Sequence, residues 1–495
     1  DTDITEGTTN NIEITPVVEK NDNVKENTLA PSSKGYFDIL INPTNVEVSF
    51  DYKVTIDILN ENLPDILISK YAILERVEEG FLLFHTITRA MYLLSYDEFV
   101  DILNNETLKR EHIVNNSNVD EDKIALDTYM HRAQCPMSDY KSLGSYVIFT
   151  TNNCNAQCFY CYENDAKKEQ VERGMTLKTA EKVVQYIINT RCDEPIKIEW
   201  FGGEPLLNVK IIDYITQRLT EENIEFTSGI ITNGLLLNKK NIEKAYKQWN
   251  VKNIQITVDG VGEVYNNIKN YKAIKFDAFS KVIKNIRDIM ETTDIALAIR
   301  INICEENIND AEDVLKYFMD DFKTFIEEKR LFLNLHPTYQ LDIDDDKIDS
   351  PVFAKIEELA ETYNIHKKRK NLLNHIPITH CMGDMGKCVV INPKGYLSLC
   401  EHWMDENIIG NITDGITNPD VIKEWNDKSG TNIEYCLSEK CPYLPICDHL
   451  VKCPSKPHCT SKQRLKKTGE YYRGLMLFEY QNYKNGITAT KNGEE

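Results

Sequence analysis

The sequence predicts an α/β protein built on a partial barrel of six βα units, with a small α+β domain before it and a cysteine-rich domain after it. Three observations predict this class. Between residues 145 and 364, short runs of β-forming residues alternate with amphipathic helical segments. Before this region, apolar and polar residues alternate with a period of two. After it, eight cysteines fall in a stretch with weak periodicity.

The central alternation predicts the barrel. Consecutive βα units give a parallel sheet with right-handed crossovers, and six units are too few to close an eight-stranded barrel. We therefore expect a partial, TIM-like barrel with its chemistry in the loops after the strand C-termini. Helices are expected at Leu177–Thr190, which Thr176 can cap, at Lys275–Met290 and at Asp310–Met319. Strands are expected at Ser145–Thr151, Ile196–Phe201, Ile224–Ile231, Asn253–Val258, Ile295–Ile303 and Arg330–His336.

The flanking regions differ from the barrel. The alternation from Val46 to Ile58 predicts one or two half-buried antiparallel strands, and Phe81–Phe84 and Met91–Leu94 predict two more, before a helix over Tyr96–Asn104. The first residues are polar and almost free of aromatics, which is typical of a flexible segment. The expected organisation is a lead-in over 1–35, the α+β domain over 36–140, the barrel over 141–370, the cysteine-rich domain over 371–465 and a tail over 466–495.

Composition excludes several classes of partner. The 78 acidic residues against 57 basic ones give a net charge of −21, which argues against nucleic acid or an anionic membrane as the main partner. No apolar stretch is long enough to span a membrane, and no signal peptide is visible. In a long chain without export signals, clustered cysteines more often bind metal than form disulfides. We therefore expect a cytoplasmic, metal-binding protein.

The most specific motif lies directly after the first predicted barrel strand, at Cys154, Cys158 and Cys161. Three thiolates in one loop can hold three irons of a four-iron cluster, and with no fourth Cys nearby the last iron is open to a small molecule. The alternatives are a zinc loop that lacks one ligand, and chance. The spacing of three residues and then two, with aromatic Tyr160 before the last Cys, resembles the radical S-adenosylmethionine (radical SAM) superfamily.

The resemblance implies that SAM chelates the open iron and that the reduced cluster breaks its S–C5′ bond. Phe201-Gly-Gly-Glu-Pro205 resembles the loop that binds the SAM amino group, and Thr257 matches a position where the family more often has Ser. Arg300 or Asn302 is expected to contact the SAM carboxylate or ribose, because Arg can clamp a carboxylate with two hydrogen bonds. The cofactor-binding residues that the resemblance implies are Tyr160, Gly202, Gly203, Glu204, Asn233, Thr257, Asp259, Arg300 and Asn302.

The eight late cysteines are the number needed to close two further four-iron clusters, with tandem zinc ribbons as the alternative. The segments 395–400 and 441–447 resemble the SPASM domain of radical SAM enzymes. Two spacings are longer than usual, between Cys436 and Cys441 and between Cys447 and Cys453, which leaves the pairing open. The family pattern assigns Cys381, Cys388, Cys400 and Cys453 to the nearer cluster, and Cys436, Cys441, Cys447 and Cys459 to the farther one. Three [4Fe-4S] clusters and SAM are therefore the expected cofactors.

The resemblance also implies a substrate class. Glu401 follows Cys400 directly, where sulfatase-maturing relatives carry an acidic residue that takes a substrate proton, so Glu401 is the candidate general base. The segments 84–86 and 92–94 resemble the leading part of peptide-maturing members, where a small domain grips a leader peptide by strand addition.

The first hypothesis is an enzyme that abstracts hydrogen from a ribosomally made precursor peptide and forms a thioether or carbon–carbon crosslink. A flavodoxin or ferredoxin would supply the low-potential electron. The second hypothesis is an anaerobic sulfatase-maturing enzyme that makes formylglycine, although the long segment before residue 145 speaks against it. A third, from another class, is a zinc-binding scaffold that only binds peptides.

Overall fold

The computed structural model describes most of the barrel and parts of both flanking regions. The residues described are 38–41, 53–54, 66–67, 69–87, 89, 91–97, 120–133, 140–162, 174–272, 277–338, 350–365, 382–401, 408–426, 433–439, 441–447 and 462–484. The expected lead-in over 1–35, most of Val46–Ile58 and most of the helix predicted over Tyr96–Asn104 lie outside these ranges.

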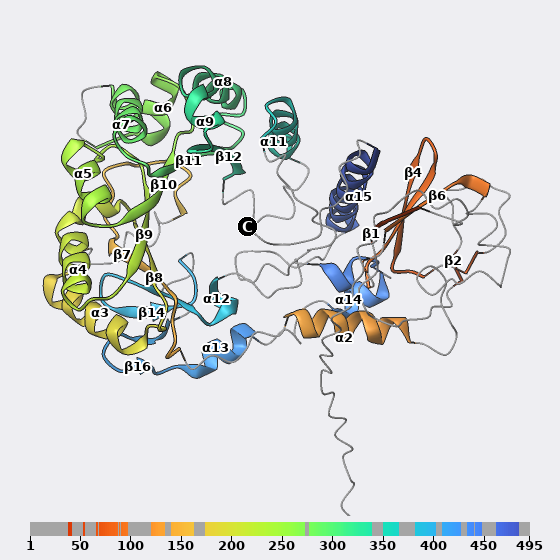
Figure 1. Cartoon of the computed structure of the whole chain (residues 1–495), viewed down its shortest axis with the longest axis horizontal. Helices are drawn as coiled ribbons and strands as arrows, with labels where there is room; N and C mark the ends of the chain where they lie inside the picture. Colours follow the sequence, from red (N-terminus) through yellow and green to blue (C-terminus); the bar gives the residue numbers. More distant parts are fainter. Residues whose placement is uncertain are drawn as a thin grey trace, which may run out of the picture.

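The largest sheet in the described residues has ten strands, and six of them are the predicted barrel strands, on the left of Figure 1. These six neighbours run parallel to one another, which confirms the predicted α/β partial barrel. Each overlaps its predicted segment, and the first has the predicted bounds. They are β7 (Ser145–Thr151), β8 (Ile196–Gly202), β9 (Phe226–Thr232), β10 (Val251–Thr257), β11 (Ala296–Ile303) and β12 (Leu331–Pro337).

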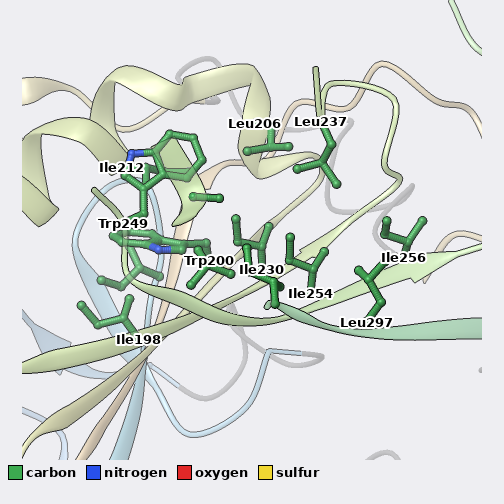
Figure 2. Close-up of a cluster of buried hydrophobic side chains, with 14 of the residues drawn as sticks. Ile198, Trp200, Leu206, Ile212, Ile230, Leu237, Trp249, Ile254, Ile256 and Leu297 are labelled. Carbon is green, nitrogen blue, oxygen red and sulfur yellow. The ribbon is translucent and has the colours of Figure 1, made fainter. Parts of the chain in front are cut away.

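Helices cover the outer face of the barrel sheet (Figure 1). Between sheet and helices lies an apolar core that includes the fully buried Trp200 and Trp249 with Ile198, Ile230 and Ile254 (Figure 2). Each such side chain contributes roughly 1.5–3 kcal/mol by leaving water. The helices are α3 (Leu177–Thr190), η3 (Pro205–Asn208), α4 (Val209–Glu221), α5 (Lys239–Lys247), α6 (Glu263–Lys269), α7 (Ala278–Thr292), α8 (Ala311–Asp321), α9 (Lys323–Glu327) and α11 (Pro351–Thr362).

The cysteine-rich region extends the barrel sheet rather than forming a separate layer. Strand β13 (Cys388–Ile391) runs parallel to β7, with Cys388 opposite Ser145. Antiparallel β14 (Tyr396–Ser398), β15 (Ile408–Asn411) and β16 (Gly415–Ile416) continue the sheet. Strands of two to four residues are too short to show a period in sequence, which explains why the sequence pattern did not predict them. Helices α12 (Met382–Met385) and α13 (Pro419–Asn426) flank them.

The N-terminal region contains a four-stranded antiparallel sheet in the order β1-β6-β5-β4. The predicted segments Phe81–Phe84 and Met91–Leu94 lie in β5 (Gly80–His85) and β6 (Met91–Leu94). The edge strands are β1 (Asp38–Ile41) and β4 (Ala72–Val77), and β2 (Lys53–Val54) pairs separately with β3 (Ile66–Leu67). Helix α2 (Glu121–Ala133) follows.

The last described helix packs against this N-terminal sheet. Helix α15 (Lys462–Lys484) reaches far into the expected tail and contacts β1, β4 and β5 (Figure 1). One buried cluster joins residues of the N-terminal sheet, α2, α14 (Ile433–Ser438), η5 (Leu444–Ile446) and α15. None of the helices in the described ranges is long and apolar enough to cross a membrane.

Candidate functional site

The loop after β7 carries the first three cysteines at the carboxyl end of the barrel strands. Cys154, Cys158 and Cys161 are all partly buried, and the first two pack against the barrel core. The Ala156 backbone N–H points at Cys154 Sγ at 3.4 Å, and the Cys161 N–H donates to the Cys158 carbonyl at 3.2 Å. An N–H directed at sulfur favours the thiolate, which is the form that binds iron.

Single-ion sites and cluster sites differ in ligand geometry. Among the residues that the structure describes, no three His, Cys, Asp or Glu side chains converge on one metal ion. The irons of a cubane stand at separate corners, so the thiolates of one cluster are not required to converge on a point. The donor set of this loop, three thiols with an inward N–H and a nearby ammonium described below, fits an anionic iron–sulfur cluster.

The segment after α6 supports the cysteine loop from the side. The Gln157 N–H donates to the Lys269 carbonyl at 2.9 Å, and the Lys272 N–H donates to the Asn155 carbonyl at 2.8 Å. Lys272 Nζ also donates to the Cys154 carbonyl at 3.3 Å. Asn155 Oδ1 accepts a further hydrogen bond from Asn233 Nδ2 at 2.7 Å. The loop is therefore held by hydrogen bonds from α6 and from the end of β9.

Asp259 is the centre of a buried polar network at the ends of β10 and β11. Its carboxylate pairs with Lys269 Nζ at 2.8 Å, and the two side chains are 0% and 3% exposed. The Tyr160 hydroxyl donates to the same carboxylate, and the Asn302 N–H donates to Asp259 Oδ1 at 2.8 Å. Arg300 Nε donates to Asn302 Oδ1 at 2.8 Å. Four of the predicted cofactor residues thus meet in one network beside the cysteine loop.

The network fixes the ionisation of its members. Burial alone lowers the pKa of Lys269, but attraction to the Asp259 carboxylate outweighs it and raises that pKa well above its usual range. The nearby Cys158 thiol also favours the charged ammonium. Burial, reinforced by Asp259, raises the pKa of the Tyr160 phenol well above its usual range. A fixed positive charge and a protonated phenol therefore lie next to the cysteine loop.

Lys269 was missed by the sequence analysis. Its position in the sequence could have indicated a buried Lys. It lies on α6, four residues after the fully buried Tyr265 and directly after buried Ile268. A Lys is rarely buried on such a face without a partner. Its partner Asp259 was predicted as a cofactor-binding residue from the family resemblance, and not as the partner of a buried Lys.

The Gly-Gly-Glu loop after β8 is built around close backbone approach. Gly202 has φ +127°, and a Cβ there would collide with the Thr151 carbonyl, while a Cβ on Gly203 would lie 2.5 Å from the Asn153 carbonyl. Glu204 is fully buried, and its oxygens accept from Thr232 Oγ1 and from the Leu206 and Asn233 N–H groups at 2.8–3.0 Å. Burial raises the pKa of Glu204 to about 7 in spite of these bonds. Its carboxyl group is thus used to join the β8 loop to the end of β9.

The remaining predicted cofactor residues lie close to this loop and network. Asn233 lies at the end of β9, where its side chain contacts Asn155 of the cysteine loop. Thr257 is the last residue of β10 and is paired with Arg300 of β11. The structure therefore brings the carboxyl ends of β7 to β11 together around Cys154, Cys158 and Cys161.

A second group of predicted residues lies at the amino end of the barrel strands. Cys388 and Glu401 line a cavity of about 510 Å³ together with Val147, Glu199 and Phe201. The wall of this cavity also includes Gly144, Ser145, Ile231, Met382 and Lys387. Cys400 is partly buried, and its Sγ lies 3.8 Å from Glu401 Oε2. Cys381 and Cys453, predicted to share a cluster with them, lie outside the described residues.

The farther cysteine group meets the N-terminal region. Cys436, Cys441 and Cys447 are buried in the cluster that contains β5, α2 and α15. The Cys441 N–H donates to the Cys436 carbonyl at 2.9 Å, and a hydrogen bond from the Cys441 side chain lowers the pKa of the Cys436 thiol. Cys459, predicted as their fourth partner, lies outside the described residues.

Comparisons with known proteins identify the domain. Residues 148–318 match the model of the radical SAM superfamily. The radical SAM cyclopropyl synthase TigE of Paramaledivibacter caminithermalis is 24% identical over 61% of this chain and 66% of its own length. The cysteine-type anaerobic sulfatase-maturating enzyme of Clostridium novyi is 24% identical over 62% of this chain and 87% of its own length. Other relatives are GTP 3′,8-cyclases, such as a probable one of Methanocaldococcus jannaschii that is 23% identical over 62% of this chain and 98% of its own length.

The fold agrees with this match. The solved structure of native anSMEcpe with bound AdoMet and the Cp18Cys peptide has a TM-score of 0.51 and 17% identity, over 69% of this chain and 99% of that one. At this identity the likeness shows the shared fold. A radical SAM domain implies SAM and one [4Fe-4S] cluster as cofactors. Residues 148–318 of this chain are therefore a radical SAM domain.

Proposed function

We propose that the protein modifies a ribosomally made precursor peptide, joining two of its residues through a thioether or carbon–carbon bond. The observation that carries the proposal is the cavity of about 510 Å³ inside the barrel, which ends at Cys388 and Glu401 of the cysteine-rich region. A cavity of this size admits one or two side chains of an extended peptide. The sulfatase-maturating enzyme among the relatives is named for the modification of a protein, which supports a peptide substrate.

The proposed cluster ligands are Cys154, Cys158 and Cys161. Bound SAM and the cluster would supply the 5′-deoxyadenosyl radical that removes hydrogen from an unactivated carbon. The chain itself holds the cysteine loop through Lys269 and Asn233, and it presents Arg300 and Thr257 at the carboxyl ends of β11 and β10. These polar groups suit the carboxylate and ribose of SAM.

The second half of the reaction is proposed for the other end of the cavity. Cys381, Cys388, Cys400 and Cys453 would hold the nearer auxiliary cluster, and Cys436, Cys441, Cys447 and Cys459 the farther one. Their chemistry would be to accept the electron that remains after bond formation. Glu401 lines the same cavity and would take the proton released by the attacking group. A flavodoxin or ferredoxin is the proposed electron donor.

The N-terminal sheet is the proposed leader-binding element. Among the described residues, β4 pairs with β5 alone, and no other strand in these ranges lies along its second edge. An extended peptide can add to such an edge through main-chain hydrogen bonds. The leader would then bind at this sheet while the modified residues enter the barrel.

The test is mass spectrometry of peptides encoded next to the gene, incubated without oxygen with the enzyme, SAM and a reductant. A crosslink removes two hydrogens and suppresses fragment ions inside the ring. Cys158→Ala should abolish 5′-deoxyadenosine formation, whereas Cys453→Ala should retain SAM cleavage and lose the crosslink. Deoxyadenosine formation without any change in the peptides would refute the proposed substrate class.

The second candidate is formylglycine formation, favoured by the similarity to the sulfatase-maturating enzyme. The same experiment separates the two candidates. Formylglycine is an aldehyde and reacts with hydrazide probes, while a crosslinked peptide does not.

A further inference from the structure

Glu199 faces the barrel cavity from the middle of β8, at a position to which the sequence analysis gave no role. Its neighbours across the sheet are Val147 on β7 and Gly229 on β9. Alternation along β8 places Ile198 and Trp200 in the core under the helices, so Lys197, Glu199 and Phe201 face the barrel interior. Glu199 and Phe201 both line the cavity.

The two carboxyl oxygens of Glu199 differ in their surroundings within the described part of the chain. Oε1 is buried and has no hydrogen-bond partner among the residues that the structure describes. Oε2 lies beside Gly229. A Cβ atom added to Gly229 would collide with Oε2 and would lie 2.7 Å from Asn253 Nδ2. The space for this carboxyl group therefore depends on the missing side chain at Gly229. Glu204, three residues past Phe201, differs because protein groups satisfy both of its oxygens.

A buried carboxylate without a partner is costly, so such groups are protonated or paired with a ligand. Burial raises the pKa of Glu199 to about 7, which leaves both forms accessible near neutral pH. The charged or titratable groups that share its face of the barrel are Lys197 on the same strand and Lys387, Cys388 and Glu401 along the cavity wall. β7 and β9 place only Val147 and Gly229 beside it.

The rest of the wall suits an aliphatic chain. Val147, Phe201, Ile231 and Met382 give the cavity apolar sides, and Glu199 and Glu401 give it acidic positions. Lys and Arg side chains combine a methylene stem with a cationic head, and they bury the stem along apolar surface while the head meets a polar group. A neutral apolar side chain would fill the space but would give the Glu199 carboxyl group no charged partner.

We propose that Glu199 is a substrate-recognition residue that binds the cationic head of a Lys or Arg side chain of the peptide inside the barrel. This inference rests on the proposed function, because it takes the cavity as the peptide site. The peptide substrate is then expected to carry a basic residue at or next to the modified position.

The test uses small probes so that it does not depend on the peptide or on catalysis. n-Butylguanidinium mimics an Arg side chain, and n-butylurea has the same shape without the charge. Dissociation constants of both are measured by ligand-observed NMR for the anaerobically purified full-length protein at pH 8.0 and pH 5.5. A charge-assisted hydrogen bond predicts about tenfold tighter binding of butylguanidinium than of butylurea at pH 8.0.

Glu199→Gln keeps the size and removes the charge, and should reduce this preference to less than about twofold. Glu199→Asp keeps a carboxylate and should retain a preference. Glu225→Gln, at an exposed position just before β9, is the matched control and should behave as wild type. In the wild-type protein, protonation of Glu199 at pH 5.5 should remove most of the preference for butylguanidinium over butylurea. This comparison does not require any variant to fold.

The inference is overturned if wild type does not distinguish the two probes, if Glu199→Gln keeps the preference, or if the preference is the same at both pH values. A peptide assay that shows no crosslink would refute the proposed function but would leave these binding results unaffected. The two failures are therefore separable.

Discussion

At the scale of single residues, the site depends on two buried charges that are treated in opposite ways. Lys269 is paired, since Asp259 accepts from it at 2.8 Å in a place with almost no solvent. Glu199 lines a cavity, and its buried Oε1 has no hydrogen-bond partner in the part of the chain that the structure describes. A buried charge that is paired can hold the loop that it contacts. A buried carboxylate without a partner lowers the stability of the folded protein and can pair with a ligand.

Lys269→Met should strongly destabilise the protein because it leaves the Asp259 carboxylate buried and uncompensated. Breaking a buried pair in this way costs about 3–5 kcal/mol, measured as the free energy of unfolding in urea. The matched control is Lys247→Ala, which breaks the exposed i,i+4 pair with Glu243 and should change stability by less than about 0.5 kcal/mol. Equal effects of the two substitutions would show that burial of the Asp259 pair is unimportant.

Glu199→Gln should stabilise the ligand-free protein at alkaline pH. Burial raises the pKa of Glu199 from its usual 4.5 to about 7. Between these values the folded protein keeps a proton that the unfolded chain releases, so stability falls as pH rises from about 4.5 to 7. Glu199→Gln does not lose stability in this way. Its free energy of unfolding should exceed that of wild type by up to about 3 kcal/mol at pH 8 and by little at pH 4.5.

Urea unfolding at both pH values measures the Glu199 effect. The other buried carboxyl groups with raised pKa values, Glu121 and Glu204, are present in both proteins and cancel in the comparison. A gain that is the same at pH 4.5 and pH 8 would contradict the raised pKa as the cause.

At the scale of elements, local signals decided which parts could be predicted. Strand β7 and helix α3 have the predicted bounds, because β7 is a continuous run of β-formers and α3 has a capping Thr and a clear apolar face. Helix α6 has seven residues and was not predicted, since two turns carry too little periodicity. Lys269 was missed with it. The cysteine loop was found because its spacing lies in one continuous segment, whereas the Glu199 cavity is assembled from distant segments.

Thr176→Ala tests the cap of α3. The Thr176 hydroxyl accepts from the Thr179 N–H at 3.1 Å, and its loss should cost about 1 kcal/mol of stability. Lys178→Ala, at the next exposed position of the first turn, is the control and should cost less than about 0.5 kcal/mol. Thermal unfolding of the three proteins gives the comparison. A cost at Lys178 that equals the cost at Thr176 would remove the capping explanation.

At the scale of the whole molecule, the N-terminal sheet and helix α15 belong to one unit. The fully buried Phe84 of β5 and Met476 of α15 belong to the same core as Cys436, Cys441 and Cys447. Tyr443 and Tyr472 stack at 5.1 Å in this core, and the Tyr472 hydroxyl donates to the Ile446 carbonyl. The proposed farther cluster and the proposed leader-binding sheet therefore share one core. No sequence pattern links segments about 350 residues apart, so this unit could not be predicted without the structure.

Met476→Ala should loosen this unit and leave the barrel intact. Removing a fully buried Met side chain costs roughly 2–5 kcal/mol, so amide exchange should accelerate in β5 and α15 and stay unchanged in β9. Leu477→Ala, on the exposed side of the same helix at 38% exposure, is the control and should leave exchange unchanged. Faster exchange in β9 would show that the two regions unfold together.

Cys154, Cys158 and Cys161 are proposed to hold a cluster with one iron open to SAM. Electron paramagnetic resonance of the anaerobically reduced protein, recorded before and after addition of SAM, tests it most directly. SAM should change the signal of one reduced four-iron cluster, and Cys158→Ala should lack both this signal and the change. Identical spectra of the wild-type protein with and without SAM would show that no iron of this cluster is open to SAM.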